Sequence, residues 1–61
     1  MTDRVYILRY REFGEVHRVE IMARDISLAE IKARTYLRNH FLFGGFLLTP
    51  KGHYIPVTPM D

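Results

Sequence analysis

The chain of 61 residues contains no cysteine. This absence excludes a disulfide framework, a thiolate nucleophile and a zinc site with cysteine ligands. A domain of this size buries only about 60% of the surface of its unfolded chain. Such domains are usually reinforced by disulfides, metal ions or association with another chain. We therefore expect a second copy or a partner to contribute to the stability of this one.

Long apolar runs and runs of like charge are also missing. No stretch approaches the roughly 18 apolar residues of a membrane span, and residues 1–4 lead into a strand pattern without a signal peptide. These features predict one cytoplasmic domain over residues 1–61, without membrane association. Nine basic residues, seven of them arginine, are interleaved with seven acidic ones, whereas a dedicated nucleic-acid binder concentrates its basic residues in a patch.

Catalytic and metal-binding motifs are absent as well. Ser27 is the only serine, and no Ser-His-Asp, phosphate-binding or dinucleotide motif occurs. The histidines, His17, His40 and His53, fall on different predicted elements at spacings unlike those of metal ligands. A single helix on a small sheet also leaves little room for a substrate pocket. We expect a protein that is not an enzyme and that holds no cofactor and no metal ion.

Two segments have the composition of β-strands, residues 4–11 and residues 15–23, which are rich in β-branched and aromatic side chains. A two-residue turn between them would force Phe13 to positive φ, which is unfavourable for a bulky residue. A three-residue loop with Gly14 in the left-handed conformation avoids this strain and is the connection we expect.

The three-residue loop divides the hairpin side chains between two faces. It pairs Tyr10 with Val16, Leu8 with Arg18, and Ile7 with Val19. One face is then expected to carry Val5, Ile7, Val19, Ile21 and Ala23. The other is expected to carry Tyr6, Leu8, Tyr10, Val16, Arg18, Glu20 and Met22.

A helix follows, and its start has a recognisable motif. The sequence from Ser27 to Glu30 matches a capping box, with Ile26 and Ile31 at the hydrophobic-staple positions. The helix is predicted over residues 28 to 39 or 40. Its sheet-facing stripe is expected to hold Ala29, Ala33, Tyr36, Leu37 and His40. Arg34 and Arg38 lie opposite, on a secondary basic face.

Two further strands are predicted after the helix. Residues 41–48 form an aromatic and aliphatic run, in which Gly44-Gly45 marks the passage from the helix end into a third strand. A fourth short strand is predicted over residues 53–58, at an edge of the sheet because Pro56 lacks an amide donor. The predicted fold is α+β, in the order ββαββ. It has a small antiparallel sheet of three to four strands, with one helix packed across one face.

One helix covers only one face of such a sheet, and an uncovered apolar face indicates an interface. The predicted partner-binding residues are Tyr6, Leu8, Tyr10 and Met22, with Arg9, Arg11 and Arg18 at the rim. Within the chain, the alternative is that residues 55–60 fold back over this face.

The same tyrosines and arginines could stack bases and contact phosphate. Against this, Glu12, Glu15 and Glu20 are expected within the same surface, where they would repel phosphate.

The order strand, turn, strand, capped helix, strand resembles that of small phage-encoded inhibitors of host machinery, namely inhibitors of bacterial RNA polymerase and several anti-CRISPR proteins. The similarity lies in chain length, in a tyrosine-rich first hairpin, and in a Ser-Leu-Ala-Glu helix start followed by an aromatic-glycine strand. This resemblance implies a stoichiometric binder that blocks a host complex. It assigns a role to no individual residue.

These observations lead to one expected function and two alternatives. We expect a non-catalytic binding protein that inhibits or modulates a larger host complex through its sheet face and exposed arginines. The alternatives are a small nucleic-acid-binding module and a structural homodimer, and we expect nucleic-acid binding to be weak. Basic residues on an acid-free face would favour nucleic acid, whereas an apolar patch rimmed by mixed charge would favour a protein partner.

Overall fold

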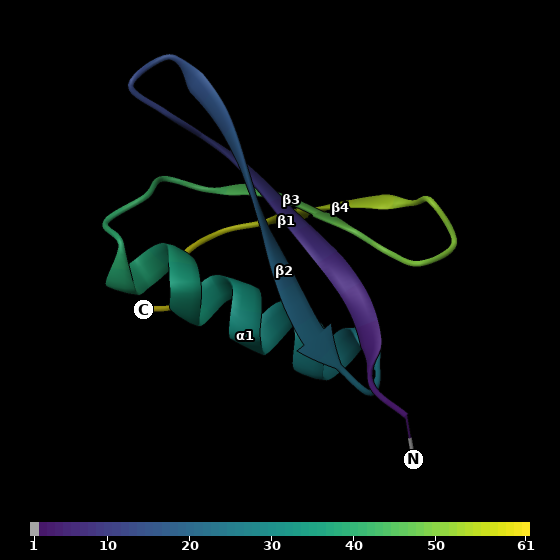
Figure 1. The fold of residues 1–61 in the computed structure, drawn as a ribbon. Helices are drawn as coiled ribbons and strands as arrows, with labels where there is room; N and C mark the ends of the chain where they lie inside the picture. The colour runs from purple at the N-terminus through teal and green to yellow at the C-terminus, as the bar shows by residue number, and fades with distance from the viewer. Residues whose placement is uncertain (1) are drawn as a thin grey trace.

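A computed structural model describes residues 2–61 of the chain. Two long strands, β1 (Arg4–Glu12) and β2 (Glu15–Ala23), precede the helix α1 (Ile26–Asn39). Two short strands follow, β3 (Gly45–Leu48) and β4 (Tyr54–Val57). All neighbouring strands are antiparallel, and their order across the sheet is β2-β1-β3-β4 (Figure 1). The predicted α+β fold with the order ββαββ is confirmed.

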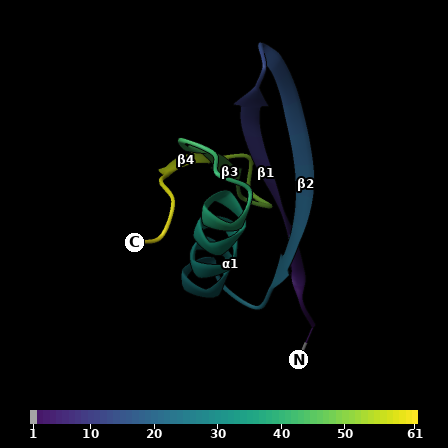
Figure 2. The same ribbon diagram turned by 90° about the vertical axis from the view of Figure 1, so that its left-hand side faces the viewer.

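The molecule has two layers, with α1 across one face of the sheet (Figure 2). The core between the layers is apolar, and its small helix residues, Ala29 and Ala33, allow the helix to approach the strands closely. Its buried members are Tyr6, Leu8, Ile21, Ala23, Ala29, Ala33, Leu37, Leu42, Leu47 and Val57. Within residues 2–61, no helix is long and apolar enough to cross a membrane.

The β1–β2 turn differs from the expected three-residue loop. It has two residues, Phe13 with φ 52° and Gly14 with φ 78°, and Glu12 pairs with Glu15 across it. Two left-handed residues are the signature of the type I′ turn, whose twist matches that of the flanking strands. The conformation costs about 1–3 kcal/mol at a bulky residue, yet the chain adopts it at Phe13.

The shorter turn shifts the pairing by one residue and corrects the assignment of faces. Leu8 lies opposite Val19 rather than Arg18, and Tyr10 lies opposite His17. A one-residue slip sends every side chain of one strand to the other face. The expected register would have required either a buried Arg18 or an exposed Leu8, and burying an unpaired charge is costly. The observed register instead pairs apolar residues of β1 with apolar residues of β2 on the face that packs against the helix.

Tyr6 and Leu8 are therefore core residues and not parts of an uncovered surface. Their side chains are 3% and 0% exposed, so the prediction that they contact a partner is wrong. Tyr10 also turns toward the helix side, where it packs against the core. The opposite side of β1 carries Val5, Ile7, Arg9 and Arg11.

The helix begins two residues earlier than predicted, and its N-cap is Asp25 rather than Ser27. Asp25 has extended backbone dihedral angles, and its carboxylate accepts a hydrogen bond from the Leu28 amide at 2.9 Å. Its carbonyl oxygen accepts from the Ala29 amide at 3.0 Å. Ser27 lies in the first turn, so the expected capping box is wrong. A negative side chain is favoured at this position because it faces the positive end of the helix dipole.

The predicted helix stripe is confirmed in part. Ala29, Ala33 and Leu37 are buried, and Tyr36 is partly buried, but His40 is exposed and lies just beyond the helix as its C-cap. The expected staple residues do not occupy the staple positions, which with Asp25 as N-cap fall on Arg24 and Ala29. Ile26 and Ile31 are exposed.

The helix C-terminus closes with a Schellman motif. The Phe41 amide donates to the Arg38 carbonyl and the Leu42 amide to the Leu37 carbonyl, the two bonds that define this motif. Phe41 has φ 56°, where glycine is the usual residue. Leu42 and Leu37 are both buried and supply the apolar contact that accompanies the motif.

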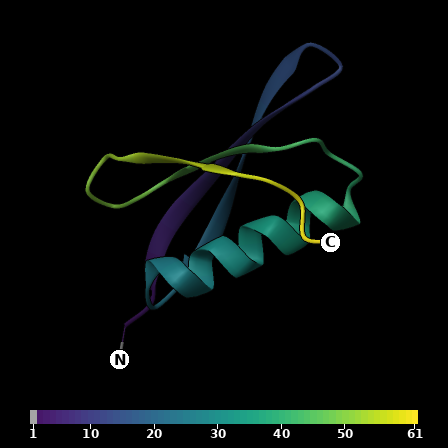
Figure 3. The ribbon, with the colours of Figure 1, turned by 180° about the vertical axis from the view of Figure 1, so that it is seen from behind.

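The C-terminal half of the chain completes the sheet and then returns to the helix. A Cβ atom on Gly45 would lie 2.6 Å from the Arg9 carbonyl oxygen, so β3 can pair with β1 only with glycine there. Strand β4, which contains Pro56, lies at the sheet edge as predicted. Beyond it the chain runs alongside α1 (Figure 3). Residues 55–60 therefore do not fold over the opposite face of the sheet.

The N-cap assignment gives a stability prediction. Asp25→Ala should lower the free energy of unfolding by about 0.5–2 kcal/mol, because the Leu28 amide loses its acceptor. Ser27→Ala is the matched control and should have a much smaller effect. Chemical denaturation followed by circular dichroism measures both, and a larger loss for Ser27→Ala would contradict the cap at Asp25.

Candidate functional site: the open face of the sheet

The side of the sheet turned away from α1 is the candidate binding surface, here called the open face. Apolar side chains make up most of it, and Phe46 and Tyr54 are 51% and 52% exposed. By strand pairing and alternation, its members are Val5, Ile7, Arg9, Arg11, Val16, Arg18, Glu20, Met22, Phe46, Leu48, Tyr54 and Pro56.

Three arginines concentrate positive charge on the open face. Arg9 lies directly opposite Arg18, and Arg11 follows Arg9 on the same side of β1. Within residues 2–61, the only pair of an acidic and a basic side chain at ion-pair distance is Glu15 and His17, at 3.8 Å. Among these residues, the three guanidinium groups therefore have no carboxylate at ion-pair distance. Like charges directly opposite one another destabilise a strand pair, so this surface has positive charge that the fold itself does not use.

The acidic residues are distributed differently from our expectation. Glu12 and Glu15 lie opposite one another at the end of the hairpin. The alternation of side chains along each strand places both on the helix side of the sheet. Glu20 alone remains on the open face, opposite Ile7. The expectation that three glutamates share the surface with the arginines is wrong, because strand alternation from the observed register places Glu12 and Glu15 on the helix side.

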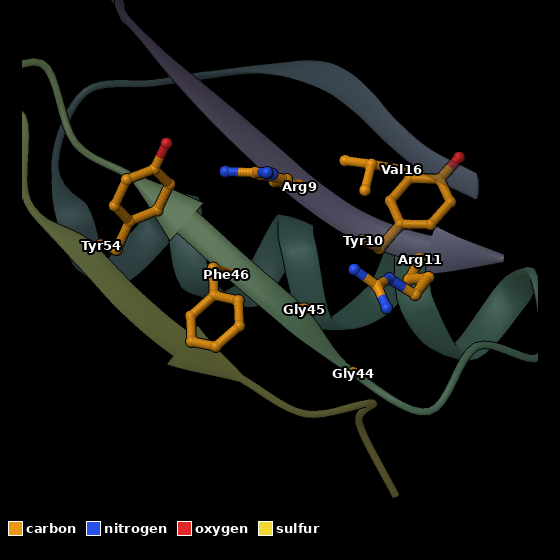
Figure 4. Close-up of a pocket in the computed structure, with 8 residues that line it drawn as sticks. All are labelled: Arg9, Tyr10, Arg11, Val16, Gly44, Gly45, Phe46 and Tyr54. Carbon is orange, nitrogen blue, oxygen red and sulfur yellow. The ribbon is translucent and has the colours of Figure 1, made fainter. Parts of the chain in front are cut away.

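An open groove of about 590 Å³ runs over the middle of this face. Figure 4 shows the Arg9 side chain extending over the sheet between Tyr54 and Val16, with Phe46 beside it. The rings of Phe46 and Tyr54 meet edge to face, with centroids 6.5 Å apart. The residues lining the groove are Arg9, Tyr10, Arg11, Val16, Gly44, Gly45, Phe46 and Tyr54.

The structure brings together only some of the predicted site residues. Arg9, Arg11, Arg18 and Met22 lie on the open face. Tyr10 packs against the core on the helix side, and part of it also lines the groove of the open face. Of the secondary basic face, Arg38 is exposed on α1, and the Arg34 guanidinium donates to the Thr58 carbonyl oxygen at 3.1 Å.

Phe46 and Tyr54 belong to the open face but are not among the individual residues predicted for it, although residues of the run 41–48 were expected there. They come from β3 and β4, and neither the pairing of β3 with β1 nor that of β4 with β3 has a local signal in the sequence. Their alternation with buried residues was the available clue, because Leu47 and Val57 face the helix while Phe46 and Pro56 do not.

Behind the open face, Tyr10 belongs to an aromatic cluster that connects the hairpin to α1. Its hydroxyl group lies 3.1 Å from that of Tyr36. His17 stacks on Tyr10 with ring centroids 5.5 Å apart, and His40 packs on Tyr36 with centroids 4.1 Å apart. The hydrogen bond with Tyr36, followed by burial and by the nearby Tyr36 and Glu12 charges, raises the pKa of Tyr10 to about 12.

The open face combines cationic and aromatic side chains. Within residues 2–61, no group of three histidine, aspartate or glutamate side chains is arranged to hold a metal ion. The chain matches no family model, no curated protein and no solved structure.

The aromatic cluster gives a prediction about pH. A tyrosine whose folded pKa exceeds its ordinary value of 10.0 stabilises the fold below pH 10, and this contribution is lost as the pH rises toward about 12. We expect ultraviolet titration of the tyrosinate absorbance to show one late ionisation near pH 12. Tyr10→Phe should remove this step and Tyr54→Phe should leave it. Loss of the late step in Tyr54→Phe alone would contradict the assignment.

Proposed function

We propose that this chain is a non-catalytic binding protein that engages a larger macromolecular complex through the open face and inhibits or modulates it. The observation that carries the proposal is a set of three arginines, without carboxylate partners, among half-exposed aromatic and aliphatic side chains. Arginine and aromatic residues are enriched among the residues that dominate binding energy at protein interfaces. An intermolecular partner that supplies carboxylates would relieve the repulsion between Arg9 and Arg18.

The apolar part of the surface favours a protein partner. Val5, Ile7, Met22 and Leu48 are aliphatic or thioether side chains, which bind a complementary apolar surface through burial, at roughly 25 cal/mol per Å². Such residues give little to a phosphate backbone. An apolar patch that includes unpaired cations therefore fits a protein surface with apolar and acidic groups.

A second copy of the chain is a poor occupant of the same face. Two open faces in contact would bring two sets of three arginines together with only Glu20 on each side to compensate. Like charge across an interface opposes association. The partner is accordingly a different molecule, and the resemblance to phage-encoded inhibitors supports a complex of a bacterial host.

A single-stranded nucleic acid is the second candidate, and one observation favours it. The turn places Glu12 and Glu15 on the other side of the sheet, which leaves Phe46 and Tyr54 beside Arg9 with little negative charge nearby. Aromatic side chains with adjacent arginines bind single strands by stacking bases and contacting phosphates. The aliphatic residues of the face remain unused in this arrangement.

Charge reversal on the open face tests the first candidate. The double variant Arg9→Glu, Arg18→Glu should lose specific partners in affinity capture from bacterial lysate, with recovery falling about tenfold or more. Arg24→Glu with Lys51→Glu is the matched control, since it changes the net charge equally on another part of the surface. Quantitative mass spectrometry compares the captured proteins. Equal recovery by the two double variants would refute binding through the open face.

Fluorescence anisotropy with single-stranded oligonucleotides tests the second candidate. Three phosphate contacts predict a slope of about −2 in a plot of log affinity against log salt concentration. We expect binding to be weaker than micromolar at physiological salt. Submicromolar binding that persists there and is abolished by Phe46→Ala would establish the nucleic-acid function instead.

A further inference from the structure

Three phenylalanine side chains project into solvent without contributing to the core. Phe13, in the β1–β2 turn, is 97% exposed, and Phe41 and Phe43, between α1 and β3, are 93% and 100% exposed. The turn and the α1–β3 connection lie on the same side of the molecule in Figure 1, with the turn projecting beyond the connection. These three residues are here called the phenylalanine tip.

Two of the three are held in an unfavourable backbone conformation. Phe13 and Phe41 are the only residues other than glycine with positive φ within residues 2–61. The type I′ turn favours asparagine at the position of Phe13, and the Schellman motif favours glycine at the position of Phe41. At both sites the chain has a large aromatic residue instead, so the local strain is not relieved by the choice of residue.

Contacts within the chain do not explain these residues. The α1–β3 connection is anchored by Leu42, which is buried and whose amide donates to the Leu37 carbonyl. The hairpin turn is held by strand pairing up to Glu12 and Glu15. The phenylalanine rings themselves have almost no intramolecular contact. The fold needs a left-handed backbone at both positions but not a bulky side chain there, and an unfavourable residue kept at such a position indicates a function.

The phenylalanine tip is continuous with the open face. Val16 and Gly44 both line the groove of the open face. Val16 follows the Phe13–Gly14 turn by two residues, and Gly44 is adjacent to Phe43 in the chain. A molecule that fills the groove therefore contacts residues that adjoin both loops of the tip in the chain.

The area and the charges of this end restrict what the tip can bind. A phenylalanine buries at most about 250 Å². The three together therefore bury less than the roughly 800 Å² that each partner contributes to a standard interface. The tip therefore adds to a larger contact, and the arginines of the adjoining open face oppose a second copy there. Glu12 and Glu15 flank Phe13, and their charges oppose insertion into an anionic bilayer.

We propose that the phenylalanine tip is a second anchoring element for the protein partner of the open face, and that its rings insert into apolar pockets of that partner. This inference depends on the proposed function, because it assigns the tip to the same partner. The strained backbone directs Phe13 and Phe41 outward before binding, so that little ordering is required when the complex forms.

Stability measurements separate a binding role from a structural one. Phe13→Asn and Phe41→Gly each place a preferred residue at a left-handed position and should raise Tm by roughly 4–8 °C. Phe43→Ser, at a residue without positive φ, is the control and should leave Tm nearly unchanged. If either left-handed variant lowers Tm, its phenylalanine supports the fold and the inference fails.

Binding is measured with a displayed library of random peptides selected on the unaltered chain. We expect the selected peptides to combine acidic and apolar residues. The triple variant Phe13→Asn, Phe41→Gly, Phe43→Ser should bind them at least tenfold more weakly while being more stable. If every selected peptide binds the triple variant and the unaltered chain with the same affinity, the inference is overturned. If Arg9→Glu with Arg18→Glu also leaves the affinity unchanged, the proposed function fails; if that variant alone loses binding, only the role of the tip fails.

Two further measurements address the other occupants. Sedimentation of vesicles made of phosphatidylcholine and phosphatidylglycerol should not carry the chain down, and analytical ultracentrifugation should show no self-association that the triple variant removes. Vesicle binding that requires the phenylalanines would assign the tip to a membrane surface. Self-association that requires them would assign it to a second copy. Either result overturns the proposal of a protein partner.

Discussion

The two-residue turn at Phe13–Gly14 is the constraint on which the rest of this structure depends. It places Glu12 opposite Glu15, and every other pair of the hairpin follows from that one. Because side chains alternate along a strand, the same register sends Leu8 into the core and Arg9 to the open face. A loop one residue longer would turn every side chain of one strand to the opposite face of the sheet. Either a cation would then be buried or core residues would be exposed. The core and the open face are thus two results of a single turn.

Local patterns in the sequence were sufficient for the elements but not for their register. The helix, the four strands and the edge position of β4 follow from periodicity, glycine positions and Pro56. The turn was mispredicted because a bulky residue disfavours positive φ locally, while the tertiary gain of matching Leu8 with Val19 under the helix is larger. The predicted cap is wrong because Asp25 and Ser27 are both good N-cap residues. Which of them caps the helix depends on the residue at which β2 ends. Of the site, the arginines and Met22 were predictable from the hairpin, whereas its aromatic residues depend on long-range pairing.

The turn also determines how charge is distributed. The net charge of the chain is only +2, which by itself predicts little about binding. The register, however, separates the hairpin glutamates at positions 12 and 15 from the arginines at positions 9, 11 and 18 and places them on opposite sides of the sheet. A weakly charged chain therefore presents a surface with three cations and one anion. This local surplus, rather than the total charge, acts on a partner at contact distance, because salt screens charges separated by more than about 8–10 Å.

The unfavourable features of the molecule are concentrated on one part of its surface. The core is apolar, no buried side-chain polar atom within residues 2–61 lacks a hydrogen-bond partner, and Asp25 caps the helix. By contrast, the opposed Arg9 and Arg18 lie on the open face and the left-handed Phe13 and Phe41 at the adjoining tip, and the opposed Glu12 and Glu15 flank the turn at the base of that tip. A domain of this size without disulfides has little stability to lose. Each of these costs could be removed by one exposed substitution that leaves the core intact. Their grouping at the open face and the phenylalanine tip therefore supports the proposal that a partner covers this surface.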